Sequence, residues 1–142
     1  MVDVSAKLVS TRVAVAAGEV HTTEEVINLL RGGGVPKGDA LAVARLAGIM
    51  AAKRTPDLVP LCHPIAIHGV TVELTLFDQR IVIEATVVTA DRTGVEMEAL
   101  TCVAVAGLAM IDMIKAVDPA ASIENVRVLS KEGGKTGSWV RQ

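Results

Sequence analysis

The sequence has almost no aromatic residues: one Phe, one Trp and no Tyr among 142 residues. Hydrophobic residues nevertheless make up 51% of the chain, so the core must consist of aliphatic side chains and Met. Such side chains bury less area per residue than aromatic ones. We therefore expect part of the stabilising burial to come from an interface between subunits.

The chain also lacks an excess of basic residues, and its formal net charge is −2. Proteins that bind nucleic acids or membrane surfaces usually carry such an excess, so neither partner is expected. The longest uncharged apolar stretch, Ala99 to Ile111, is shorter than the ~20 residues that span a bilayer. It is expected to form a buried helix. A local basic cluster can still bind a small anion.

Cysteine is scarce as well. Cys62 and Cys102 do not form a C-x-x-C motif, and two cysteines are too few for a disulfide framework. This usage is typical of a reducing, cytoplasmic compartment. Asp3 and Lys7 interrupt any apolar run that would serve as a signal peptide. No metal is expected, because the three His and two Cys lack the spacing of metal ligands.

The hydrophobic pattern predicts the order strand, helix, helix, strand, strand, helix, strand. This order favours a single α+β domain over residues 1–142, with helices on one face of an antiparallel sheet. The first half is expected to contain a strand at 9–20, a short helix between a Thr22–Glu25 capping box and Gly32, and a helix from an Asp39 N-cap to about Arg54. An irregular extended stretch follows around Pro56, Pro60 and Pro64. The second half is expected to contain a hairpin of strands 70–76 and 81–88, a long helix from Thr93 or Gly94 to before Pro119, a strand at 123–129 and a loop at 131–138.

Two places combine ionisable side chains with a defined local geometry. Asp112 and Lys115 lie three residues apart on one helix face among apolar neighbours, a setting that shifts pKa values and suits proton transfer. A structural ion pair is the alternative. His63 stands on a stiff, extended segment between two prolines. It is either a substrate contact or acid–base group, or a structural histidine.

Glu96 and Glu98 begin the long helix, where the helix dipole favours negative charge. That electrostatic role is the alternative to a role in the chemistry. If residues 98 to 112 form one helix, about 21 Å separate its two ends. The two ends then serve sites of different subunits, or one end is structural. Several lysines near glycine turns form candidate anion sites, or are ordinary solvated charges: Lys37, Lys53, Lys115, Lys131 and Lys135.

Several stretches together resemble one family, the cyclic pyranopterin monophosphate synthases, also called molybdenum cofactor biosynthesis protein C. The most specific stretch is Thr93–Thr101, and the matches run in order over nearly the whole chain. The other stretches are residues 1–7, 37–39, 51–55, 61–64, 112–116 and 133–135. Pro36, Ile111 and Cys102 depart from the family pattern without removing a candidate catalytic group.

The resemblance implies a ferredoxin-like fold and a homohexamer, assembled as a trimer of dimers with its pocket at the dimer interface. It implies a lyase that converts a cyclised dihydro-GTP, (8S)-3',8-cyclo-7,8-dihydroguanosine 5'-triphosphate, to cyclic pyranopterin monophosphate with release of pyrophosphate. No cofactor is implied. The catalytic residues that it implies are Asp112, Lys115 and Lys37. The substrate-binding residues are Leu61, Cys62, His63, Met97, Glu98, Glu96, Lys53 and Lys131, and Lys135 is expected to join them in binding the triphosphate.

Two other functions remain open from the residues. One is a non-catalytic regulator that binds a phosphorylated nucleotide and assembles through its sheet edges. The other is a hydrolase that uses Glu96 and Glu98 with a metal ion.

Overall fold

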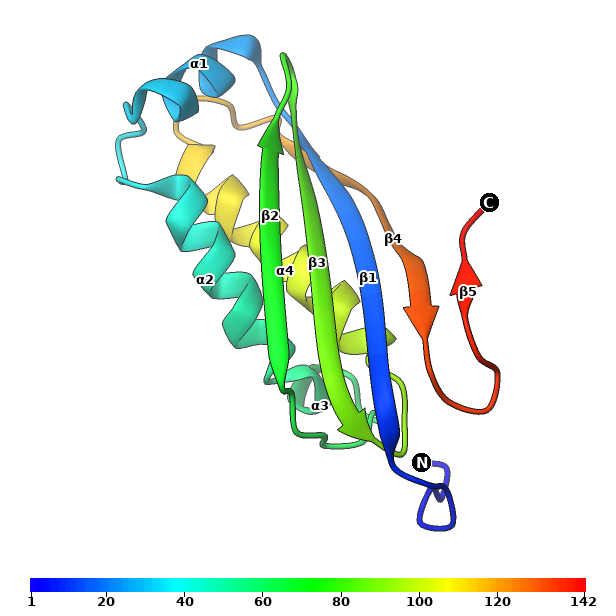
Figure 1. Ribbon diagram of the computed structural model, residues 1–142. Helices are drawn as coiled ribbons and strands as arrows, with labels where there is room; N and C mark the ends of the chain where they lie inside the picture. Colours follow the sequence, from blue (N-terminus) through cyan, green and yellow to red (C-terminus); the bar gives the residue numbers. More distant parts are fainter.

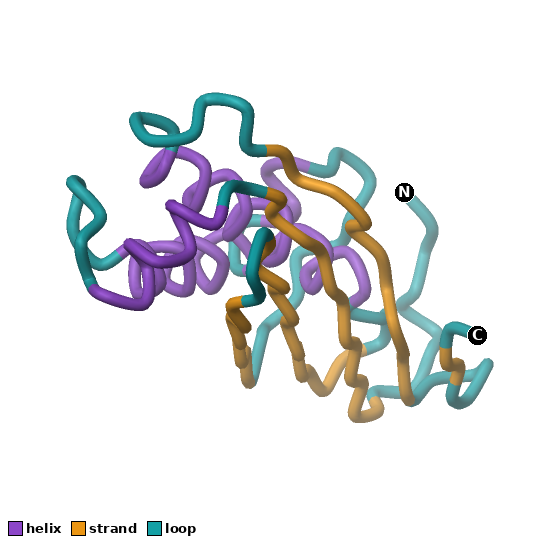
Figure 2. Tube along the Cα trace, turned by 90° about the horizontal axis from the view of Figure 1, so that it is seen from above, coloured by secondary structure: helices purple, strands orange, loops and turns teal.

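A computed structural model describes residues 1–142 as one antiparallel sheet with helices on one face. Figure 1 shows the sheet in front of the helices, and Figure 2 shows the two layers from above. The strands are ordered β2-β3-β1-β4-β5. The elements are β1 (Ser10–His21), α1 (Glu24–Gly32), α2 (Ala40–Ala52), α3 (Thr55–Leu58), β2 (Gly69–Leu76), β3 (Arg80–Asp91), α4 (Glu96–Ile114), β4 (Ser122–Glu132) and β5 (Trp139–Val140).

The connections make this a ferredoxin-like fold. A helical segment joins β1 to β2, a hairpin joins β2 to β3, and α4 joins β3 to β4, which is the β-α-β-β-α-β pattern. The pairs β1–β3, β1–β4 and β2–β3 are all antiparallel. The predicted α+β fold class is therefore confirmed. The prediction that residues 1–142 are a single domain stays a prediction.

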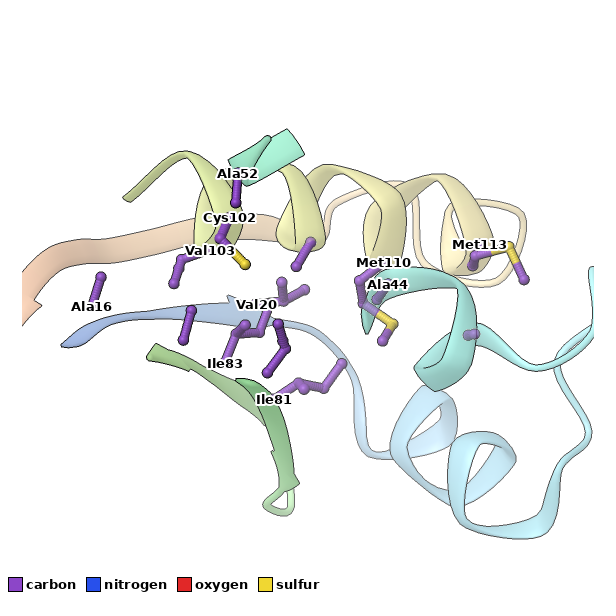
Figure 3. Close-up of a cluster of buried hydrophobic side chains, with 14 of the residues drawn as sticks. Ala16, Val20, Ala44, Ala52, Ile81, Ile83, Cys102, Val103, Met110 and Met113 are labelled. Atoms are coloured by element: carbon purple, nitrogen blue, oxygen red, sulfur yellow. The ribbon is translucent and has the colours of Figure 1, made fainter. Parts of the chain in front are cut away.

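The core lies between the sheet and the helices and is built from aliphatic side chains and Met, as the composition predicts. Alternate residues of the central strands, such as Val20, Ile81 and Ile83, point toward α4 and meet Val103 and Met110 (Figure 3). All five are at most 1% exposed. This packing fixes α4 across the sheet, with its first turn near α3 and its last turn toward the end of the sheet that carries α1 (Figure 1).

Of the two N-cap residues predicted from the sequence, the structure confirms one and corrects the other. The side-chain oxygen of Asp39 accepts from the amide of Ala42, so the predicted N-cap of α2 is confirmed. The predicted N-cap of the first helix is wrong by one residue. Thr23 caps α1 by accepting from the amide of Val26, whereas the Thr22 hydroxyl donates to the Asp118 carboxylate at 2.7 Å.

Two elements are absent from the sequence prediction. The proline-rich stretch includes one helical turn, α3, in which Pro56 occupies the first turn and needs no amide partner. The C-terminal region adds a two-residue strand, β5, which pairs with the edge of β4. Finally, α4 starts at Glu96, two residues after Gly94.

Helices α2 and α4 run antiparallel in close contact. Gly48 of α2 faces Cys102 and Ala106 of α4, and the residues before α2 reach the last turn of α4. By length and composition alone α4 would qualify as a membrane-spanning helix, but more than half of it is buried in this packing, as in a core helix of a soluble protein.

Replacing Gly48 by alanine should destabilise the protein. A methyl group there would lie 2.9 Å from the backbone oxygen of Cys102, which cannot rotate away. Overpacking of this kind costs about 1–3 kcal/mol, which exceeds the gain of about 1 kcal/mol in helix propensity. Denaturant unfolding measures the difference. Gly32→Ala is the matched control, because nothing lies within 4 Å of a methyl group at that position. Equal stability of the two variants would contradict the packing argument.

Candidate active site

Asp112 is the centre of an ionic cluster at the C-terminal end of α4. Its carboxylate accepts from the Nζ of Lys115 at 2.6 Å and from the Nζ of Lys37 at 2.7 Å. Lys115 follows one helical turn later, as the spacing predicts. Lys37 comes from the loop before α2, and the sequence gives no sign of this contact. The structure therefore brings together the three residues that the family resemblance proposes as catalytic.

The cluster fixes the charge of Asp112. The hydrogen bond from Lys115 and then that from Lys37 lower the pKa of Asp112 from its usual 3.8 to about 2. Asp112 is therefore a carboxylate at any physiological pH. It accepts hydrogen bonds and has no proton to give, so the lysine ammonium groups are the proton donors of this cluster.

A hollow of about 300 Å³ lies at the other end of α4. Its lining combines the loop after α3 with the first turn of the helix. The predicted residues among those that line it are Leu61, Cys62, His63, Glu96, Met97 and Glu98. Thr93 and Gly94 complete the lining, and they belong to the stretch that carries the most specific resemblance.

Glu98 is the buried acid of this hollow and is only 3% exposed. Burial is the main cause that raises the pKa of Glu98, and the neighbouring charge of Glu96 raises it further. A hydrogen bond from its own backbone acts in the opposite direction. Glu96 is instead paired with Lys131 of β4 at 3.1 Å. The two acids therefore have different environments although both line one hollow.

Neither thiol is prepared to act as a nucleophile. Burial, and then the nearby Glu98, raise the pKa of Cys62, while burial raises that of Cys102 to about 12. Since the thiolate is the reactive form, both side chains stay unreactive at neutral pH. Cys62 contributes to the shape and polarity of the hollow.

A basic region adjoins this end of α4. It is a second hollow, of about 270 Å³, that shares Gly94 and Glu96 with the first. Its cationic lining residues are Lys7, Arg12, Lys131 and Lys135. Two of them, Lys131 and Lys135, are among the predicted site residues. Two acids, Glu96 and Glu132, line the same space, so the four cations outnumber the acids and the hollow favours an anion.

Arg12 is the residue of this region that sequence reasoning missed. It shares the core side of β1 with Ala14 and Ala16, and its Nε is buried without a hydrogen-bond partner. Its guanidinium lies against Gly134, whose φ of +78° is a backbone conformation that favours glycine. The sequence carries no clear signal for this role, because residues 13–17 are all apolar and do not show which side of the strand faces the core.

The two groups lie at opposite ends of one continuous helix. The fourteen residues from Glu98 to Asp112 span about 21 Å. Lys53 is the exposed C-cap residue of α2. Because α2 is antiparallel to α4, Lys53 lies at the Glu98 end, without a hydrogen bond or ion pair to the other site residues. One chain does not bring all the predicted site residues together.

Replacing Glu98 by glutamine should change the pH dependence of stability. The folded protein holds the proton of Glu98 more tightly than the unfolded chain, so the wild type loses stability as pH rises through the usual pKa of 4.5 toward the raised value. Glutamine has no such proton. The variant should therefore gain free energy of unfolding relative to the wild type as the pH rises above 4.5 toward the raised pKa of Glu98. Glu25→Gln, at an exposed position of α1, should show no such gain. A constant difference between Glu98→Gln and wild type would contradict the buried-acid argument.

The fold and the site together define a class of protein: a ferredoxin-like α+β domain with ionisable groups gathered at both ends of one core helix. Comparison with known proteins then gives the family. The model of the MoaC family matches residues 1–134. The chain belongs to the MoaC family.

Several proteins named cyclic pyranopterin monophosphate synthase are similar in sequence to nearly the whole chain. A cyclic pyranopterin monophosphate synthase of Streptomyces griseus is 64% identical over 99% of this chain and 80% of its own length. One from a Nocardioides species is 60% identical over 99% of this chain and 88% of its own length. A protein of Mycobacterium bovis named cyclic pyranopterin monophosphate synthase 2 is 59% identical over this whole chain and 85% of its own length. These relatives are synthases, so the chain is an enzyme rather than a non-catalytic regulator.

Proposed function

We propose that this enzyme converts (8S)-3',8-cyclo-7,8-dihydroguanosine 5'-triphosphate to cyclic pyranopterin monophosphate and pyrophosphate, in the biosynthesis of molybdenum cofactor. The observation that carries the proposal is the pairing of two lysines with one ionised aspartate, Asp112, together with a basic hollow suited to phosphates. The relatives named above support the same activity. The proposed compartment is the cytoplasm.

The two lysines at Asp112 act as general acid and base in the opening and rearrangement of the purine-derived ring. Lys37 and Lys115 share one carboxylate acceptor, which holds both side-chain nitrogens in one place. Asp112 orients the two ammonium groups and stabilises whichever of them is charged. Either ammonium group can give a proton to the substrate, and a lysine that has done so can take a proton back in a later step.

The basic residues at the other end bind the triphosphate. Lys131 and Lys135 come from the β4–β5 region, and Lys53 comes from the end of α2. Cations at this position stabilise the negative charge that grows as the P–O bond breaks and pyrophosphate leaves. Arg12 and Lys7 join this group. His63 and Glu98 position the base or the sugar, with Leu61, Cys62, Met97 and Glu96 as further contacts.

A second copy of the chain completes the site, because the two groups are too far apart to meet one small molecule within a single chain. A twofold axis that crosses α4 near its middle would bring the Asp112 end of one copy to the Glu98 end of the other. The helix has no charged residue between Glu98 and Asp112, and Leu108 is 59% exposed on it. An apolar helix with an uncovered face favours a packed partner. The proposed assembly is a homohexamer built as a trimer of such dimers.

The direct test is turnover by the purified protein. The cyclised dihydro-GTP is supplied, and cyclic pyranopterin monophosphate and pyrophosphate are measured by chromatography. Equal amounts of the two products are expected. Binding of the substrate with no product would overturn the proposal.

A further inference from the structure

The N-terminal segment, residues 1–7, is tied down beside His63. Its Val2 carbonyl lies 2.7 Å from His63 Nε2. Arg92 Nε donates to the Lys7 carbonyl at 3.0 Å and holds the other end of the segment. Between them, the Asp3 carboxylate accepts from the Ser5 amide at 2.8 Å and closes a turn. The segment, called here the N-terminal strap, is therefore fixed at both of its ends.

The contact with Val2 decides which ring nitrogen of His63 carries a proton. A carbonyl oxygen can only accept, so Nε2 must be the donor. In the neutral ring, Nδ1 then has the lone pair and is the atom left to accept a proton or a hydrogen bond. Without the strap, either nitrogen can hold the proton.

His63 also stands between two hollows. One, of about 520 Å³, lies between the strap and Arg92, and the other is the 300 Å³ hollow that contains Glu98. His63 and Thr93 line both. The strap thus occupies one nitrogen of a ring that also borders the proposed substrate site.

We infer that the N-terminal strap is a positioning element for His63: the Val2 carbonyl fixes the ring in its Nε2–H form and so leaves Nδ1 as the acceptor for the substrate. The histidine of many sites is set in this way by a partner on its second nitrogen. The role given to the substrate rests on the proposed function. The tautomer itself does not.

The test is nitrogen NMR of the imidazole rings in the full chain and in a variant that lacks residues 2–6. In the full chain, neutral His63 should be protonated on Nε2 alone. In the deletion variant, it should become a mixture of both tautomers. His68 is an internal control, because its Nδ1 accepts from the Ala90 amide and stays unprotonated in both proteins. Arg92→Gln, which releases the Lys7 carbonyl, should move His63 in the same direction by a smaller amount.

Turnover of the full chain and of the deletion variant distinguishes a failure of this inference from a failure of the proposed function. The deletion variant should turn over about tenfold more slowly than the wild type, with its thermal unfolding unchanged. A His63 ring protonated on Nδ1 in the full chain, or one that neither variant changes, would overturn the inference. So would a changed tautomer with unchanged turnover. If the full chain makes no product, the proposed function fails, while the NMR result still decides whether the strap sets the tautomer.

Discussion

Asp112→Ala should lower kcat by about 10²–10⁴-fold, which is the range for loss of general acid–base catalysis. The reason is geometric: one carboxylate holds the ammonium groups of both Lys37 and Lys115. Without it the two cations repel each other and lose their shared orientation. The Asp112 side chain is 54% exposed, so the variant should keep the stability and assembly of the wild type. Steady-state kinetics and light scattering measure the two properties.

Two further variants sharpen this prediction. Asp112→Asn keeps the shape and removes the charge, and it should be nearly as inactive because the amide cannot stabilise two ammonium groups. Asp78→Ala removes an aspartate whose side chain is 93% exposed at the β2–β3 hairpin, and it should leave kcat unchanged. Full activity of Asp112→Ala would show that the cluster is structural.

Lys131→Ala should raise KM roughly 10- to 100-fold, because a hydrogen bond to a charged group contributes about 1.5–3 kcal/mol. The substitution also removes the partner of Glu96, 3.1 Å away, and leaves that negative charge beside the phosphates. High salt should raise the KM of the wild type and so reproduce part of this effect, because salt screens exposed charges. Arg31→Ala, which removes a cation from α1, should not change KM. An unchanged KM for Lys131→Ala would place the triphosphate elsewhere.

The fold was largely predictable because its pattern is local. Alternating apolar residues mark β2 and β3, a stretch rich in Val and Ala marks β1, and Asp39 marks the start of α2. The errors arise where tertiary contacts choose between equal local candidates. Thr22 and Thr23 are both suitable caps, but the Asp118 carboxylate, 96 residues away, takes the hydroxyl of Thr22. A strand of two residues such as β5 is too short to show any alternation.

The site was predictable in parts. The pair Asp112 and Lys115 follows from helix periodicity. The contact of Lys37 with Asp112 joins residues 75 positions apart, and only the antiparallel packing of α2 on α4 creates it. Lys37 was predicted only from the resemblance to the family, because its spacing from Asp112 in the sequence gives no signal. Arg12 belongs to no motif, and only the register of the sheet shows its place: it lies on the same side of β1 as Ala14, which pairs with Lys131.

The central claim is that two copies of the chain share one site, and complementation of inactive variants tests it most directly. Asp112→Ala and His63→Ala damage opposite ends of α4. Co-expressed in equal amounts, they should recover about one quarter of wild-type turnover, because half of the dimers are mixed and each has one intact site. Asp112→Ala with Lys37→Ala is the control and should recover nothing, since both residues belong to the same end. No recovery from the first pair would contradict a shared site and place all the catalytic residues within one chain.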